Sequence, residues 1–349
     1  MINTEYYKDL TAMNTFGMKV KARCFIEYDS VADLVDIEFE ELARPVLHIG
    51  GGSNLLFTDD FKGTVLHSKI NFIEEIGSEG DFALVSVGAG VVFDDFCDWA
   101  AKEGLWGVEN LSYIPGEVGA SAVQNIGAYG VEVKDVIRKV YCYDTVEEEF
   151  VNFDVEDCDY RYRDSAFKDP EIKGRYIVTH VVFALSREPK PVLDYGHLKT
   201  SVEEAAAAAG KPVNPALIRK VIIRIRKEKL PEPSVMGSAG SFFKNPVITA
   251  EHFARIESAA KAELGPDYKV PHYDLPDGTV KVPAAWMIEQ CGWKGRRSGG
   301  AAVYEKQPLV IVNYTGEAYP EEIIGLERRV IASVKQKFDV VLHPEVEHI

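Results

Sequence analysis

The chain lacks the features that mark membrane-spanning and disulfide-stabilised proteins. No uninterrupted apolar stretch is long enough to cross a bilayer, and no basic segment followed by an apolar run opens the sequence, so we expect neither a membrane anchor nor a signal peptide. The five cysteines are odd in number, scattered and without a Cys-x-x-Cys pair, which argues against a disulfide framework and against a metal site. We therefore expect reduced thiols in a cytoplasmic protein.

Basic residues are also fewer than acidic residues. The 349 residues include 39 Lys and Arg but 55 Asp and Glu, which gives a formal net charge of −16. A diffuse acidic surface repels nucleic acid and anionic lipid, so neither is an expected partner, and no obligatory protein partner is indicated. An acidic protein that binds an anionic ligand must therefore do so with a local cluster of basic groups and backbone amides.

The hydrophobic content of 46% is enough to form buried cores, and the length predicts two or three domains of about 150 residues each. In the first segment short strands alternate with helices, and from about residue 71 the pattern shifts toward β. We expect strands over residues 45–49, 82–88 and 176–183, and helices over residues 93–103 and 320–337.

Three further segments have distinct helix signals. Ser30 resembles an N-cap with a carboxylate three residues later, which predicts a helix to about Leu42. Residues 186–215 contain four prolines and an alanine run, and we interpret them as an arm with a short helix. Residues 217–229 predict a basic amphipathic helix whose charges are expected to form a solvated face.

A glycine loop directly follows the strand expected at residues 45–49. Gly50, Gly51 and Gly52 leave backbone amides free to point at one place, and Ser53 and Asn54 add side-chain donors. A backbone cradles a pyrophosphate in this way. The pattern is neither G-x-G-x-x-G nor a Walker motif, so it predicts neither a Rossmann domain nor a P-loop. A plain tight turn is the alternative.

A second glycine-rich run spans residues 113–130. It places Gly116, Gly119, Gly127 and Gly130 among uncharged polar residues. So long a run with so few charges is expected to be buried in irregular structure, where its backbone needs hydrogen-bond partners. A large planar heterocycle rimmed with acceptors would supply them. A structural Ω-loop is the alternative.

The run 237–246 combines two glycines with a hydroxyl, an ammonium and a carboxamide. Ser241, Lys244 and Asn245 could together hydrogen-bond an anion and offer a proton at the same place, while the glycines allow close approach of the backbone. An ordinary Gly/Ser-rich turn ended by a proline is the alternative.

Two isolated charges are weaker candidates. If residues 158–168 form a strand, Arg161 and Arg163 share one face, and Arg163 could hold a carboxylate in a bidentate pair. A surface salt bridge to Asp164 or Glu156 is the alternative. Glu345 lies between Pro344 and Val346, so partial desolvation would raise its pKa and suit it as a proton donor, although a single carboxylate in a tail is usually a surface charge.

Taken together, these segments resemble the UDP-N-acetylenolpyruvoylglucosamine reductase family, in its longer type I form. The resemblance runs from residue 14 nearly to the C-terminus. Six motifs occur in family order, at residues 48–56, 114–119, 124–130, 162–165, 240–246 and 343–346. One such match would be weak, but six in order are specific.

The resemblance implies a three-domain flavoprotein of mixed α/β (α+β) class. A two-part FAD-binding region of the vanillyl-alcohol-oxidase-like type precedes a C-terminal α+β domain that binds the UDP-sugar. We accordingly expect the first FAD-binding subdomain at residues 1–68, with residues 339–349 returning to it. The second subdomain spans residues 69–230 with the type I arm at about 186–215, and the substrate domain spans residues 231–338.

The resemblance also implies residue roles. Ser241 matches the general acid, and Arg163 and Glu345 match its partners in stabilising the enolate. The substrate-binding matches are Tyr195, Lys229, Asn245 and Gln290. The pyrophosphate loop matches Gly50, Gly51, Gly52, Ser53, Asn54 and Leu55, and the segment along the flavin matches Pro115, Gly116, Gly119, Ala120, Ser121, Asn125, Gly127, Ala128 and Tyr129.

The implied reaction has two halves. NADPH reduces FAD, and the enolpyruvyl ether of the UDP-sugar then takes a hydride from flavin N5 and a proton from Ser241. FAD is expected to be non-covalent, because neither His nor Cys lies in the pyrophosphate loop. Two rival hypotheses remain: another FAD-dependent oxidase of the same fold, and a non-catalytic flavin or nucleotide-sugar binding protein.

Overall fold

The computed structural model describes residues 1–349 and divides the chain into two compact units. The first unit contains residues 1–10, 20–52 and 60–228, and the second contains residues 11–19, 53–59 and 229–349. The division into three domains stays a prediction. None of the helices combines the length and the apolar composition that crossing a bilayer requires.

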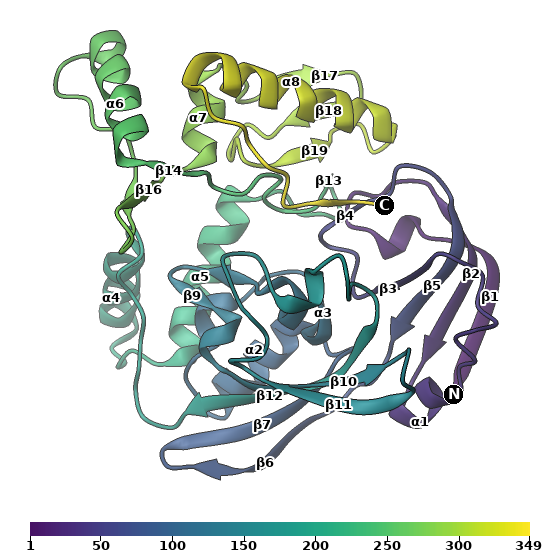
Figure 1. The fold of residues 1–349 in the computed structure, drawn as a ribbon. Helices are drawn as coiled ribbons and strands as arrows, with labels where there is room; N and C mark the ends of the chain where they lie inside the picture. Colours follow the sequence, from purple (N-terminus) through teal and green to yellow (C-terminus); the bar gives the residue numbers. More distant parts are fainter. The chain divides into compact units, whose positions relative to one another are not determined.

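A four-stranded sheet in the first unit is built from the N-terminal segments. Its strands lie in the order β1 (Ile2–Asp9), β2 (Lys21–Tyr28), β5 (Phe61–Ser68) and β3 (Val46–Ile49), and all neighbours except β1 and β2 are parallel (Figure 1). Val65 and Leu66 in β5 are fully buried, as expected of a parallel strand inside a sheet. Short β3 ends where the glycine loop begins.

A five-stranded antiparallel sheet forms the rest of the core of this unit. Its strands lie in the order β11 (Glu149–Asp154), β10 (Ile137–Asp144), β12 (Tyr176–Ser186), β7 (Phe82–Gly88) and β6 (Ile73–Glu79). The helices α2 (Phe93–Lys102) and α3 (Val118–Gln124) lie against it (Figure 1). The strand and helix predictions at residues 82–88 and 93–103 are therefore confirmed, because their apolar periodicities face one core.

Two local predictions are corrected. Helix α1 spans only Val31–Val35, although Ser30 caps it by accepting a hydrogen bond from the Asp33 N–H. Ile37 and Phe39 are both buried, and residues two apart point to nearly opposite sides of a helix, so the turns after Val35 bury both side chains in a way that one amphipathic helix does not. The glycine-rich run is also not wholly irregular, since α3 lies inside it and supplies backbone hydrogen bonds there.

The arm contains α4 (Leu198–Ala209) and is followed by α5 (Pro215–Lys229). The short helix expected in the arm is confirmed. The two helices share an apolar cluster, made of Trp106, Leu198, Val202, Ile218, Val221 and Ile222. The charges of α5 are not all solvated, because the Arg219 side chain is only 12% exposed and pairs with Asp94 and Asp98 of α2.

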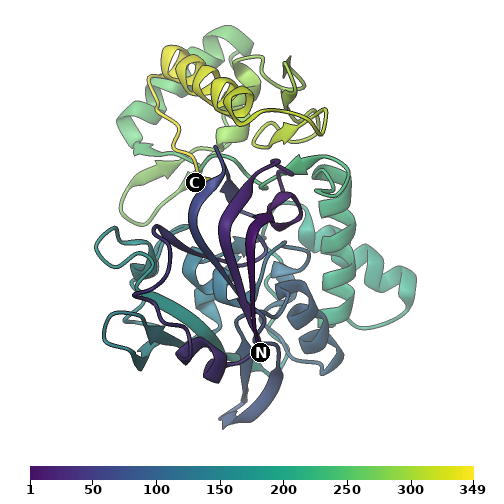
Figure 2. The same cartoon turned by 90° about the vertical axis from the view of Figure 1, so that its right-hand side faces the viewer.

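The second unit is a smaller α+β assembly. One sheet has the order β13 (Gly237–Ser238), β19 (Ile311–Asn313), β18 (Ala301–Val303) and β17 (Arg297–Ser298), and another has the order β14 (Val247–Thr249), β16 (Thr279–Lys281) and β15 (Tyr273–Asp274). The long helix α8 (Pro320–Phe338) runs along β18 and β19 in both views (Figures 1 and 2). Helices α6 (Ala250–Leu264) and α7 (Ala284–Gln290) complete this unit.

Several short elements complete the two units, and each pairing lies within one unit. Strand β4 (Leu55–Leu56) pairs in parallel with the C-terminal β20 (Glu347–His348), and β8 (Gly127–Ala128) pairs with β9 (Val131–Glu132). Short 3-10 helices span Thr11–Met13, Glu109–Leu111, Val133–Asp135 and Ala166–Lys168.

Candidate active site

The glycine loop after β3 lies directly against the start of α3. A Cβ on Gly50 would come within 3.0 Å of the Ala120 Cβ, and a Cβ on Gly51 within 3.4 Å of the Gly116 Cα. Gly52 has a φ of +60°, which a larger side chain rarely adopts. The structure thus brings the two predicted cofactor segments into close contact, with little room for a side chain at Gly50.

Helix α3 holds the glycine-rich run in place. A Cβ on Gly119 would lie 2.9 Å from the Ala89 Cβ, so this turn of the helix is packed tightly on the chain that follows β7. Two predicted cofactor side chains are used within the protein. The Ser121 hydroxyl donates to the Val118 carbonyl, and Asn125 ends the helix with a φ of 49° while its amide nitrogen donates to the Arg161 carbonyl at 2.9 Å.

The residues around this run fit a ligand rich in hydrogen-bonding atoms. Buried polar atoms normally have partners, yet the Gln124 Nε2 and the Asn110 Oδ1 have none in the protein. The neighbouring glycines Gly50 and Gly119 leave little room for a side chain, so their backbone is accessible at close range. In the same run Ala128 and Tyr129 are half-buried and Pro115 is exposed, so FAD is compatible with this donor set and shape.

Arg163 is not in a strand, which corrects the prediction for residues 158–168. It lies in a tight turn in which the backbone N–H and C=O groups of Arg161 and Asp164 exchange hydrogen bonds of 3.0 Å, and its φ is 56°. Its guanidinium donates to the carbonyls of Asn125 and Gly127. Arg163 is therefore fixed to the end of the glycine-rich run within the first unit.

The segments that carry Ser241 and Glu345 pair through their backbones in the second unit, one residue beyond Ser241. The Glu345 N–H donates to the Phe242 carbonyl at 2.8 Å, and the Lys244 N–H donates to the His343 carbonyl at 2.9 Å. Phe242 and Phe243 are buried, so this backbone pairing is anchored in apolar surroundings. Gly240, with a φ of +68°, makes the turn that leads into Ser241. Both Ser241 and Glu345 are half-buried.

Asn54, at the end of the predicted pyrophosphate loop, hydrogen-bonds to the C-terminal segment that contains Glu345. Its side-chain amide donates to the Glu345 carbonyl at 3.0 Å, and its own carbonyl accepts from the Glu347 N–H at 2.9 Å. Leu55 continues the contact as part of β4, and Ser53 is half-buried just before it. The C-terminal segment and residues 53–56 thus form one hydrogen-bonded layer.

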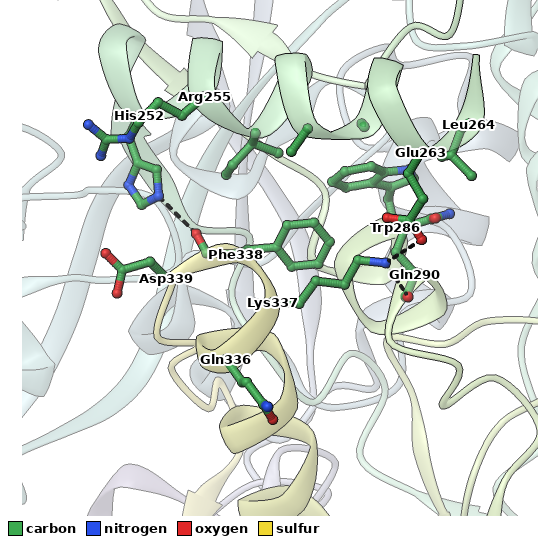
Figure 3. Close-up of a pocket in the computed structure, with 13 residues that line it drawn as sticks. His252, Arg255, Glu263, Leu264, Trp286, Gln290, Gln336, Lys337, Phe338 and Asp339 are labelled. Carbon is green, nitrogen blue, oxygen red and sulfur yellow. Dashed lines mark hydrogen bonds and ion pairs between the residues drawn. The ribbon is translucent and has the colours of Figure 1, made fainter.

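The predicted substrate groups of the second unit sit at opposite ends of α7. The Asn245 side-chain oxygen accepts from the Ala284 N–H at 2.9 Å, at the start of the helix. Gln290 is its last residue, about 9 Å farther along the axis at 1.5 Å per residue. Gln290 lines a cavity of about 320 Å³ between α6 and α8, where its backbone carbonyl accepts from Lys337 (Figure 3).

The other two substrate candidates lie near α5 and the arm. Tyr195 is 46% exposed, and its ring meets the Tyr129 ring edge-on at 5.8 Å between centroids. Lys229 is the exposed last residue of α5. The structure thus joins Tyr195 to the glycine-rich run.

Sequence reasoning missed two residues of this region. Asn110 is 1% exposed, and its amide nitrogen donates to the carbonyls of Tyr129 at 3.0 Å and Val192 at 2.8 Å, which ties the arm to the glycine-rich run. Arg226 of α5 donates to the Tyr113 carbonyl, and burial lowers the pKa of its guanidinium. No sequence pattern marks Asn110, whereas Arg226 lies in the predicted basic helix.

Comparison with known proteins agrees with this architecture. Residues 22–150 match the family model described as FAD binding domain, and residues 232–349 match the model described as UDP-N-acetylenolpyruvoylglucosamine reductase, C-terminal domain. The UDP-N-acetylenolpyruvoylglucosamine reductase of Bacteroides fragilis (strain YCH46) is 50% identical over 97% of this chain and 98% of its own length. The enzyme of the same name from Porphyromonas gingivalis (strain ATCC 33277) is 45% identical over 97% of each chain.

A solved structure supports the fold. The crystal structure of UDP-N-acetylenolpyruvylglucosamine reductase (MurB) from Thermus caldophilus matches all of this chain and 98% of its own, with 23% sequence identity and a TM-score of 0.67. The mixed α/β fold with an FAD-binding domain and a distinct C-terminal domain is therefore confirmed. From this fold and an identity of 50% over nearly the whole length, the chain belongs to the UDP-N-acetylenolpyruvoylglucosamine reductase family.

Proposed function

We propose that this chain reduces UDP-N-acetylglucosamine enolpyruvate to UDP-N-acetylmuramate, with NADPH as the hydride donor, in peptidoglycan precursor synthesis. The observation that carries the proposal is the backbone pairing of the Ser241 segment with the Glu345 segment, through Phe242. A serine hydroxyl and a protonated carboxyl group on two paired, half-buried segments suit the protonation of a carbanionic centre. A cytoplasmic location and the three-domain division at residues 68 and 230 belong to the same proposal.

Ser241 would give its hydroxyl proton to the α-carbon of the enolpyruvyl group. When bound, non-covalent FAD supplies hydride transfer between the nicotinamide and the substrate. The Arg163 guanidinium, and Glu345 as a neutral carboxylic acid that donates a hydrogen bond, would stabilise the charge that spreads into the substrate carboxylate. A serine hydroxyl holds its proton tightly, so it serves as an acid only for a strongly basic centre in fixed geometry. The buried pair Phe242 and Phe243 supports that fixed geometry.

The remaining residues would bind rather than react. Gly50, Gly51 and Gly52 would hold the cofactor pyrophosphate with backbone amides, and Asn125 would order the end of α3. Tyr195, Lys229 and Asn245 would hold the diphosphate of the UDP-sugar, and Gln290 would contribute an amide. Tyr195 is exposed and lies on the arm, which suits a group that meets the substrate as it enters.

An anaerobic visible spectrum tests the proposal. The purified protein is recorded alone, after NADPH, and after the enolpyruvyl UDP-sugar. Flavin absorption that bleaches with NADPH and returns with the sugar supports the reaction. Flavin that stays reduced after the sugar is added refutes the assignment of this sugar as the substrate. Oxygen consumption without the sugar favours an oxidase. Flavin that never bleaches indicates a binding protein, and a protein that binds no FAD refutes the whole assignment.

A further inference from the structure

A histidine clamped between two carboxylates lies under the glycine loop. His67 Nδ1 is 2.9 Å from Glu27 Oε1, and His67 Nε2 is 3.0 Å from Glu117 Oε1. The exposed fractions of the three side chains are 9% for His67, 13% for Glu117 and 23% for Glu27. Glu27 and His67 face each other in register on the neighbouring strands β2 and β5. The sheet itself therefore places two of the three members of this triad.

The third member reaches the triad from the cofactor region. Glu117 stands between Gly116 and Gly119, and it is the residue before α3, yet its side chain makes no capping bond to that helix. Its carboxylate turns to His67 instead. Its other oxygen, Oε2, lies 3.3 Å from the place of a Cβ on Gly50. A carboxylate is thus held directly beside the loop predicted to receive a pyrophosphate.

This position creates an electrostatic conflict. A carboxylate without a counter-charge beside the loop would repel an anionic ligand. The titratable groups that face the triad are Tyr28 on β2 and His48 on β3, which hydrogen-bond each other at 2.7 Å. Burial, and then the charge of His67, lowers the pKa of His48 to about 3, so His48 is neutral at physiological pH. Tyr28 is neutral as well, because burial raises the pKa of its hydroxyl. His67 is the member of this group that can supply positive charge.

We propose that His67 is a positioning residue for the cofactor: it holds the Glu117 carboxylate by one oxygen and offsets its charge, so that the neighbouring glycine loop can accept the FAD pyrophosphate. The inference rests on the assigned FAD-binding domain and on the pyrophosphate role proposed above for Gly50–Gly52, and it is independent of the roles proposed for Ser241 and Arg163.

The proposal has a pH signature. Burial lowers the pKa of His67, but the hydrogen bonds and charges of Glu117 and Glu27 outweigh burial, so the pKa is raised above its usual value. A protonated His67 favours an anion nearby, and by linkage the bound anion favours the protonated form. FAD affinity is therefore full below the folded-state pKa of His67 and falls as pH rises through it.

The test is a titration of the apoprotein with FAD, followed by flavin fluorescence, from about pH 6 to about pH 9. We expect the wild-type Kd to rise about tenfold across this range, the size of effect that one charge roughly 10 Å away produces. His67→Gln should bind FAD about tenfold more weakly at low pH and show no pH dependence. Glu117→Gln should keep the affinity and move the pH dependence to lower pH, because His67 loses one of the two carboxylates that raise its pKa.

The double variant separates charge from structure. If His67 acts by offsetting Glu117, then adding Glu117→Gln to His67→Gln should restore FAD affinity, whereas a merely structural histidine would not be rescued. His180→Gln is the control, because His180 stacks on Tyr141 in the other sheet and should leave the pH profile unchanged. An unrescued double variant, or a wild-type Kd that does not depend on pH, overturns the inference. Wild-type protein that binds no FAD at any pH would instead refute the proposed cofactor.

Discussion

The glycine-rich region of the first unit and the Ser241 region of the second unit are built in opposite ways. Around α3, glycines matter because they lack a side chain: a Cβ would crowd Ala120 if it were added to Gly50, and would crowd Ala89 if it were added to Gly119. Around Ser241, backbone pairing is the support, and the side chains of Ser241 and Glu345 are what it presents. Substitutions should therefore damage binding and stability in one region and chemistry in the other.

The largest effect is expected from Ser241→Ala. Flavin reduction by NADPH should stay within about twofold of wild type, while flavin reoxidation by the enolpyruvyl UDP-sugar should slow about a thousandfold, the usual contribution of a positioned proton donor. Anaerobic stopped-flow absorbance measures the two half-reactions separately. Thermal melting should be unchanged, because the backbone pairing does not involve the hydroxyl. If both half-reactions slow together, Ser241 is not the proton donor.

The opposite behaviour is expected from Gly119→Val. A Cβ here would lie 2.9 Å from the Ala89 Cβ and 3.4 Å from the Ala89 Cα and carbonyl oxygen, so backbone has to move. The free energy of unfolding should fall by about 3 kcal/mol, and the purified protein should lose FAD. Denaturant melts and the flavin-to-protein absorbance ratio measure both effects. Gly325→Val in α8 is the matched control, since nothing lies within 4 Å of its Cβ position. Equal stability of the two variants would contradict the packing argument.

The same comparison shows what sequence could predict. Local signals succeeded: the Ser30 cap, strand β7 and helix α2 depend on residues close in sequence. The glycine motifs also singled out two segments that the structure packs against each other, although their cofactor role stays a prediction. Contacts between distant segments were not predictable, because no local pattern records them. Examples are the Asn54 amide on the Glu345 carbonyl, 291 residues away, and the Arg163 guanidinium on the Asn125 carbonyl.

Asn110→Asp tests the link between the glycine-rich run and the arm. The substitution keeps the shape of the side chain but removes the donors to the Tyr129 and Val192 carbonyls, which leaves buried acceptors without partners. The free energy of unfolding should fall by about 2 kcal/mol. The KM for the UDP-sugar should rise while FAD stays bound, because the arm with Tyr195 is released and α3 is not. Steady-state kinetics with the flavin content measured in parallel would reveal this difference, and loss of FAD with unchanged KM would contradict it.

The smallest effect is expected from Lys229→Ala, which tests binding without chemistry. The substrate diphosphate is unchanged by the reaction, so a group that binds it stabilises ground state and transition state alike. The KM for the UDP-sugar should rise about tenfold with kcat nearly constant. Lys227→Ala is the control on the same helix, since that ammonium lies 5.1 Å from the centre of the Tyr113 ring. A selective loss of kcat in Lys229→Ala would mean that the exposed end of α5 positions the reacting atoms. Lys229 would then belong with the residues that act in the chemical step, and not with those that only bind substrate.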